Sequence, residues 1–161
     1  MSIISIDPIL SCKEAIEFES RIFADDKDKE WQAMNRAGEA IGDSLLRDMR
    51  ELRTIPHRPR ILVLVGKGHN GGDALVAAKR FLKTIPTAKA VIWPYCPWDE
   101  VRPLCKRAYD EFIELVGKRV EEVENLKSFL DLSKTCYDEM KINCPDEKSK
   151  RNIWLLPSDK P

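Results

Sequence analysis

Apolar residues recur every three or four positions along much of the first half of the chain, the spacing of helices with one buried face. After Ser11 a serine and a glutamate three positions apart are typical of a helix start, and a helix is expected to about Phe23. A charged break over residues 24–29 precedes a long helix that begins near Glu30 and ends before Pro56. The apolar positions of this second helix are Trp31, Met34, Ala37, Ile41, Leu45, Met49 and Leu52.

Two short apolar runs differ from this helical spacing. Residues 60–65, Arg-Ile-Leu-Val-Leu-Val, are typical of a strand buried on both faces of a parallel sheet, and residues 88–93 form a second such run. The stripe over residues 74–83 predicts a helix between them. A further helix is expected after Asp99 as its cap, with a proline in its first turn and Gly117 as its stop. Helices alternating with strands predict an α/β doubly wound fold.

The last part of the chain has a weaker pattern. We expect a single, truncated domain over residues 1–161, with residues 118–161 as a tail of uncertain structure. Residues 143–151 are interpreted as a loop, and residues 153–156 as a short strand or loose tail. The apolar positions in this tail that are compatible with a further helix are Val120, Val123, Leu126, Phe129 and Leu130.

Charge and composition narrow the possible partners. Lys plus Arg equal Asp plus Glu at 27 each, so the net charge is zero and we expect neither nucleic acid nor an anionic membrane as partner. No apolar run reaches the length of about 18 residues that a membrane span needs, and the N-terminus lacks the pattern of a signal peptide. The five cysteines are scattered, which favours free thiols and a cytoplasmic location.

A glycine-rich segment, residues 66–73, follows the first strand and precedes a helix. Its sequence is Gly-Lys-Gly-His-Asn-Gly-Gly-Asp. Glycines permit positive φ and allow backbone amides to approach a ligand closely. The following helix offers free N–H groups, and ligands of open α/β sheets bind at the carboxyl ends of strands. The segment is therefore interpreted as a phosphate-binding loop, with a glycine-rich tight turn as the alternative.

Three side chains of this loop have both a structural and a functional interpretation. Asp73 is either a first-turn carboxylate favoured by the helix dipole or a hydrogen-bond partner of a ribose hydroxyl. Asn70 is a turn residue or an oxygen ligand of a cation, and His69 is a solvated side chain or a phosphate contact. The loop is no Walker A motif, and the acidic residue that would hold an adenosine ribose after the second strand is missing.

Three segments together resemble the NAD(P)H-hydrate epimerase family, the YjeF N-terminal domain. Residues 63–80, Val-Leu-Val-Gly-Lys-Gly-His-Asn-Gly-Gly-Asp-Ala-Leu-Val-Ala-Ala-Lys-Arg, are similar to its glycine motif. Residues 34–41 resemble its Met-Glu-Arg-Ala-Gly-x-Ala helix, and residues 9–15 resemble its opening helix. The departures are His69 for an Asn and Ala74 for a Gly. The resemblance covers the N-terminal portion of the family domain only.

The resemblance implies a Rossmann-like three-layer sandwich with a mostly parallel sheet, a homodimer and one potassium ion per subunit. It implies an isomerase that interconverts the R and S epimers of hydrated NADH and NADPH (NADHX and NADPHX) in metabolite repair. An NAD(P)H-hydrate dehydratase would be its functional partner. Carried onto this sequence, Asn70 helps to bind potassium, and the residues that line the hydrated dinucleotide are Gly68, His69, Asn70, Gly71, Gly72 and Asp73.

The second half of the family pattern is missing. The Asp-Ala-x-x-Gly strand is not found, and only residues 156–159, Leu-Pro-Ser-Asp, faintly echo the Ile-Pro-Ser-Gly segment. These parts supply the catalytic acid and base, so the catalytic residues stay unassigned. The sheet is expected to be incomplete, with an exposed edge. The alternatives are an inactive nucleotide-binding or dimerisation module, and a remnant that folds poorly.

Overall fold

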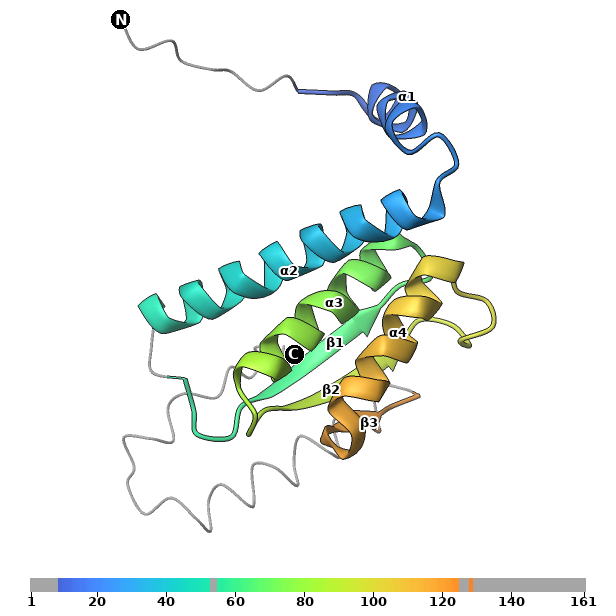
Figure 1. The fold of residues 1–161 in the computed structure, drawn as a ribbon. Helices are drawn as coiled ribbons and strands as arrows, with labels where there is room; N and C mark the ends of the chain where they lie inside the picture. The colour runs from blue at the N-terminus through green and yellow to red at the C-terminus, as the bar shows by residue number, and fades with distance from the viewer. Residues whose placement is uncertain (1–8, 53–54, 125–127, 129–161) are drawn as a thin grey trace, which may run out of the picture.

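The computed structural model describes residues 9–52, 55–124 and 128. From α2 onwards, α-helices and strands alternate along the chain, an order typical of α/β proteins (Figure 1). The elements are α1 (Cys12–Phe23), α2 (Lys27–Leu52), β1 (Arg60–Val65), α3 (His69–Thr84), β2 (Lys89–Pro94), α4 (Pro103–Val116), the 3-10 helix η1 (Gly117–Arg119) and β3 (Val120–Glu122).

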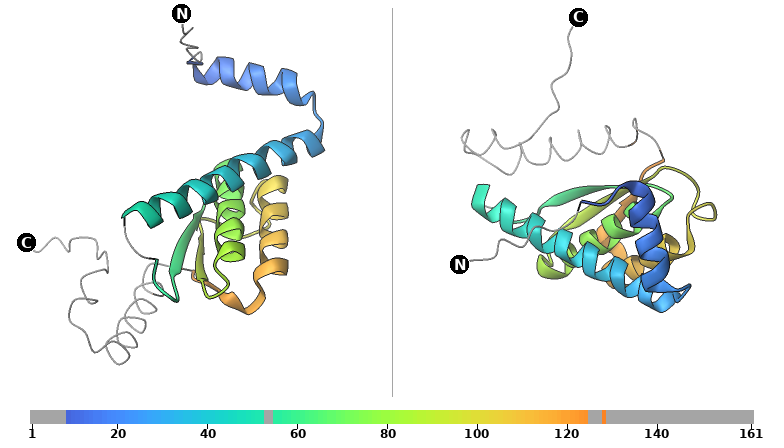
Figure 2. Two further views of the ribbon diagram at one scale, coloured as in Figure 1. Left: turned by 60° about the vertical axis from the view of Figure 1, so that its left-hand side comes forward. Right: turned by 90° about the horizontal axis from the view of Figure 1, so that it is seen from above.

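The three strands form an open parallel sheet in the order β1-β2-β3. Arg60 pairs with Lys89 and Val65 with Pro94, without interruption between them. Helices α3 and α4 cover one face of the sheet, and α2 packs against α3 on the side away from α4 (Figures 1 and 2). The predicted α/β fold is confirmed, and the described residues build an incomplete Rossmann-like sandwich.

The core lies between the sheet and the helices above it. Leu75, Phe81 and Leu82 of α3 and Phe112 of α4 are fully buried in one cluster with Ile92 of β2. Burying one such side chain contributes about 1.5–3 kcal/mol. Helix α3 contacts the strands β1 and β2 and the helices α2 and α4. These contacts fix the position of the loop at the start of α3.

Helix α1 begins as the sequence predicts but makes little contact with the rest of the fold. Ser11 Oγ accepts a hydrogen bond from the Glu14 amide at 3.3 Å, and Glu14 Oε2 accepts one from the Ser11 amide at 2.8 Å. This reciprocal pair is the predicted capping box. The helix buries no residue and projects away from the sheet (Figure 2).

Four expectations about the elements are wrong. Helix α2 begins at Lys27, within the expected charged break over residues 24–29. Asp99 does not cap α4, because the chain becomes helical only after Arg102, which has extended dihedral angles. Helix α3 begins at His69, so most of the expected glycine loop is the first turn of a helix. Residues from Val120 form a strand instead of a helix, since the Val123 amide donates to the Ile92 carbonyl at 2.9 Å and extends the ladder beside β2. The expectations for residues 125–127 and 129–161 lie outside the described residues.

In the described part of the chain, none of the helices has the length and apolar character needed to cross a bilayer.

Candidate functional site

The start of α3 lies at the carboxyl end of β1, where Gly66, Lys67 and Gly68 connect the two elements. Gly68 is the N-cap, and no side chain of the described residues accepts a hydrogen bond at this end. The Gly71 amide bonds back to the Gly68 carbonyl at 3.1 Å, while the first amides of a helix have no acceptor within the helix. The helix end therefore presents free N–H groups and a positive dipole end to a ligand.

The glycines of this segment divide into two pairs by their surroundings. A Cβ added to Gly66 or Gly68 would meet no heavy atom of the described part within 4 Å. A Cβ on Gly71 would collide with the Gly66 carbonyl oxygen, and one on Gly72 would lie 2.5 Å from Met34 Sδ. The first pair faces open space, where a ligand can approach the backbone. The second pair is needed for packing.

The glycines of this segment do not use the positive φ that glycine permits. Among the described residues, Gly117 is the glycine with positive φ, whereas Gly68 has an extended φ of −96°. Gly71 and Gly72 lie within α3 and are buried. Glycine is required here because neighbouring atoms occupy the space of a Cβ, which is a constraint of packing and not of backbone conformation.

The polar side chains of the segment gather on the first turn of α3. His69 and Asn70 are exposed, and Asp73 is half-buried. Burial raises the pKa of Asp73 above its usual value of 3.8, and nearby His69 partly opposes this shift. Positions three and four residues apart are neighbours on a helix, so both His69 and Asn70 lie beside Asp73. Among the described residues, none forms a hydrogen bond or ion pair with the Asp73 carboxylate.

The connection between β2 and α4 supports the loop from one side. The Tyr95 amide donates to the Val65 carbonyl at 2.8 Å, and the Arg102 amide donates to the Lys67 carbonyl at 2.9 Å. The buried thiol of Cys105 lies 3.7 Å from the Gly66 carbonyl oxygen, a weak hydrogen bond. These supporting residues were missed in the sequence, because nothing in their local pattern reveals contacts with a distant loop.

Comparison with known proteins identifies the family. A family model described as the YjeF-related protein N-terminus matches residues 30–141, more than half of the chain. The chain belongs to the YjeF N-terminal family. This match confirms the resemblance inferred from the motifs. The matched region contains the glycine-rich segment, residues 66–73, and most of helix α2.

A curated relative of this YjeF-type chain is the bifunctional NAD(P)H-hydrate repair enzyme Nnr of Gloeobacter violaceus. It is 40% identical over 60 residues, which are 37% of this chain and 11% of the enzyme. The chain therefore matches only a small part of the length of that relative.

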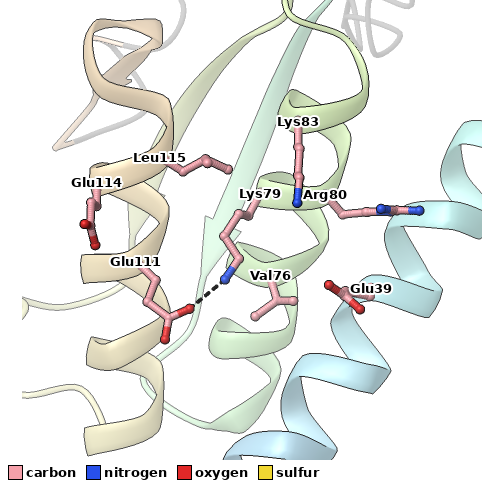
Figure 3. Close-up of a pocket in the computed structure, with 8 residues that line it drawn as sticks. All are labelled: Glu39, Val76, Lys79, Arg80, Lys83, Glu111, Glu114 and Leu115. Atoms are coloured by element: carbon pink, nitrogen blue, oxygen red, sulfur yellow. Dashed lines mark hydrogen bonds and ion pairs between the residues drawn. The ribbon is translucent and has the colours of Figure 1, made fainter.

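A separate groove of the YjeF-type chain, about 700 Å³ in volume, lies along the outer side of α3 (Figure 3). Lys79 Nζ and Glu111 Oε2 form an ion pair across it at 2.7 Å. The groove extends away from the first turn of α3, so we place the phosphate site at the open glycines instead. Its lining residues are Glu39, Val76, Lys79, Arg80, Lys83, Glu111, Glu114 and Leu115.

Oxygen ligands for a cation are few at the candidate site. Asn70 and Asp73 are neighbours on the first turn of α3 and offer an amide oxygen and a carboxylate. Over residues 9–52, 55–124 and 128 there is no group of three His, Cys, Asp or Glu side chains that could hold a metal ion. Two oxygens do not complete the shell of a hard cation, and the helix N-terminus is itself positive. These residues alone do not fit a cation site.

Proposed function

We propose that this chain binds hydrated NADH or NADPH and acts as an NAD(P)H-hydrate epimerase, interconverting the R and S forms. One observation carries the proposal. The uncapped start of α3 faces open space beside Gly66 and Gly68, at the carboxyl end of β1, in a chain of the YjeF N-terminal family. The name of the Gloeobacter relative supports a hydrated nicotinamide dinucleotide as the ligand.

The amides at the start of α3 would hold a phosphate of the dinucleotide. His69 and Asn70 are the first residues of the helix, so their N–H groups have no acceptor within the helix. A phosphate there gains hydrogen bonds and the favourable field of the helix dipole. No cationic side chain is required for this contact, although exposed Lys67 adds positive charge beside it.

Asp73 would contact a ribose hydroxyl or the nicotinamide end of the ligand. Its half-buried carboxylate has no partner among the described residues, so a ligand hydroxyl would supply the missing hydrogen bond. Epimerisation through loss and return of water needs an acid and a base beside the nicotinamide ring. We assign neither role within the described residues.

Potassium binding through Asn70 is a separate part of the proposal and rests on the family alone, because the described residues do not by themselves fit a cation site. If the proposal holds, potassium chloride raises the melting temperature above that in sodium chloride at equal ionic strength, and Asn70→Ala removes the difference. Equal melting temperatures in the two salts would exclude this ligand role.

A binding module without turnover is the second candidate function. It is favoured by the position of β1 at the edge of the described sheet, because the loop that follows β1 then has supporting residues on the β2 side alone. Binding without preferential stabilisation of the transition state does not accelerate a reaction. Homodimer formation and cooperation with an NAD(P)H-hydrate dehydratase are proposed for either function.

Turnover separates the two functions. Purified R-NADPHX is incubated with the full chain and potassium, and the two epimers are separated by chromatography. Asp73→Asn tests the site, and Asp48→Asn on the exposed face of α2 is the matched control. Conversion above the spontaneous rate, reduced only by Asp73→Asn, supports the epimerase. No conversion with a ligand-induced rise in melting temperature supports the module. Neither effect in a folded sample refutes both.

A further inference from the structure

The connection between β2 and α4, residues 95–102, is attached to the glycine-rich segment at both of its ends. At one end the Tyr95 amide donates to the Val65 carbonyl at 2.8 Å, where β1 ends. At the other end the Arg102 amide donates to the Lys67 carbonyl at 2.9 Å. Because a backbone hydrogen bond joins them, Arg102 and Lys67 are direct neighbours in space although they are far apart in the sequence.

A third contact holds the middle of this connection. The Trp98 indole donates to Glu122 at the end of β3 at 2.9 Å. The Trp98 ring also stacks on Tyr109 of α4, with 3.7 Å between the ring centroids. The connection is thus tied to β3 and α4 as well as to the glycine-rich segment, so the backbone of Arg102 has a defined position beside the candidate phosphate site.

Arg102 and Lys67 place two positive charges side by side. Both residues are exposed, and in the described part of the chain the charged group of neither forms a hydrogen bond or ion pair. The next arginine of α4, Arg107, is by contrast paired with Glu111 at 3.4 Å. Adjacent like charges repel each other, and an anion that contacts both relieves this repulsion. The pair therefore favours a negatively charged group of a ligand.

The pair lies on the side of the fold where dinucleotide-binding α/β proteins hold the adenosine ribose. In such folds an acidic residue after the second strand binds the 2′-hydroxyl of NAD, or an arginine nearby accommodates the 2′-phosphate of NADP. β2 ends at Pro94, which is paired with Val65, and the next residues are Tyr, Cys and Pro. This chain therefore lacks the acidic residue after β2 and has Arg102 close by.

Two carboxylates of the same connection lie in its middle. Asp99 and Glu100 belong to a turn in which the Glu100 amide donates to the Pro97 carbonyl at 3.0 Å. The connection loops out beyond the start of α4, on the side away from α2 (Figures 1 and 2). Its two ends, in contrast, are bonded to the glycine-rich segment. The charges attached directly to that segment are therefore positive.

We propose that Arg102, assisted by Lys67, binds the 2′-phosphate of the ligand, so that this chain prefers NADPHX to NADHX. The inference rests on the proposed function and adds a substrate preference to it. A phosphate monoester carries about −1.5 to −2 charges at neutral pH, and a guanidinium donates two parallel hydrogen bonds to it. Tyr95, which is 80% exposed, offers a ring face on which the adenine stacks.

Equilibrium binding with two pairs of ligands tests the preference. Isothermal titration calorimetry with the full chain measures the dissociation constants of NADPHX and NADHX. It also compares adenosine 2′,5′-bisphosphate with AMP, two probes that lack the nicotinamide. We expect about tenfold tighter binding of the 2′-phosphorylated member of each pair. The advantage should shrink as the concentration of sodium chloride rises, because salt screens exposed charges.

A pair of variants assigns the preference to Arg102. Arg102→Gln should weaken the binding of NADPHX about fivefold more than that of NADHX, because the lost charge contacts the 2′-phosphate. Arg102→Lys should keep part of the preference, since it retains the charge but not the two parallel hydrogen bonds. Lys118→Gln is the matched control, at an exposed cation beyond the opposite end of α4, and should keep the wild-type preference. Circular dichroism checks that the variants fold.

Four results would overturn the proposal. Equal dissociation constants for NADPHX and NADHX would refute the preference and leave the proposed function intact. Tighter binding of NADHX would mean that a carboxylate, Asp99 or Glu100, holds the 2′-hydroxyl instead. A preference that survives fully in Arg102→Gln would exclude Arg102 as its cause. No binding of either hydrated dinucleotide to the folded chain would refute the proposed function and the preference together.

Discussion

Two pairs of glycines within one short segment have opposite surroundings. Gly66 and Gly68 face open space, whereas Gly71 and Gly72 are buried against the carbonyl of Gly66 and the side chain of Met34. The open pair leaves room for a ligand at the start of α3, and the buried pair brings α3 close to its neighbours. The comparison shows that a glycine-rich motif can combine a binding requirement with a packing requirement a few residues apart.

The same packing requirement extends to α2. A Cβ on Gly38 would lie 2.5 Å from Val76 Cβ and 2.9 Å from the Asp73 carbonyl oxygen. The glycine therefore allows α2 to approach α3 closely one turn after the candidate site. Substitutions at the buried and open glycines should therefore separate effects on stability from effects on binding.

Gly71→Ala should have the largest effect. Its Cβ would overlap the Gly66 carbonyl oxygen and lie 3.1 Å from Cys105 Sγ, so backbone as well as side chain must move. We expect the free energy of unfolding to fall by about 3 kcal/mol or more. Urea denaturation followed by circular dichroism measures the loss. A midpoint equal to that of the wild type would contradict the buried role of this glycine.

Gly38→Ala should destabilise the fold by about 2 kcal/mol, because the new Cβ meets a branched side chain and a backbone carbonyl that have little freedom to move. The measurement is again urea denaturation. Ala40, exposed on the same helix, offers a control in Ala40→Ser, which should leave the midpoint within experimental error of the wild type. Because Gly→Ala by itself raises helix propensity, an unchanged or higher midpoint for Gly38→Ala would contradict close packing at this position.

Gly72→Ala should cost less, about 1 kcal/mol, because the colliding atoms belong to the flexible end of Met34. The double variant with Met34→Ala tests this explanation, since shortening Met34 removes the collision. We expect the two changes together to be less destabilising than the sum of the single changes, by about 1 kcal/mol. Additive losses would show that the strain arises elsewhere.

Gly66→Ala should change stability by only about 0.5 kcal/mol, since its Cβ would point into open space and φ is not positive. It should instead reduce the rise in melting temperature that NADPHX produces, by crowding the approach of the phosphate to the amides of α3. A full ligand-induced rise in this variant would place the phosphate elsewhere.

Asp73→Asn should give the smallest change in stability, and it should be a gain at neutral pH. Burial raises the pKa of Asp73, so its protonated form is favoured in the folded state. The contribution of Asp73 to the free energy of unfolding is therefore fully present below the usual pKa of 3.8. This contribution is lost as the pH rises through the higher pKa of the folded state. Melting curves should show a stabilised variant at pH 7 and no difference below about pH 3.8. A variant that is less stable at pH 7 would contradict this assignment.

The sequence predicts the local elements of this fold better than their boundaries and contacts. Residues 60–65 form β1 as expected, because Pro59 and Gly66 bound an unbroken apolar run. The expectation that both faces of this strand are buried is wrong, since Leu62 and Leu64 are 39% and 62% exposed. The predicted start of α3 is too late, because a glycine-rich sequence favours a loop, whereas Gly71 and Gly72 lie within the first turn of the helix. β3 was missed because three residues are too short for a strand periodicity, and Val120 and Val123 also fit a helix.

The candidate site was located in the sequence but not explained by it. The glycine motif and Asp73 were found from local pattern alone. The contacts of Gly71 and Gly72 involve Cys105 and Met34, which are more than 30 positions away, and only the folded chain brings them together. Which glycines are open and which are buried is therefore a property of tertiary structure.

The spatial order of the strands, β1-β2-β3, is also their order along the chain. The helices likewise pack in chain order, α2 beside α3 and α3 beside α4, with one strand between the members of each pair in the sequence. During translation, every new element of the described part thus finds its neighbour already outside the ribosome. Such a fold can assemble from its N-terminal side in steps, with few long loops to close. We expect the α2–β1–α3 unit, with the candidate phosphate site, to form while α4 and β3 are still being made.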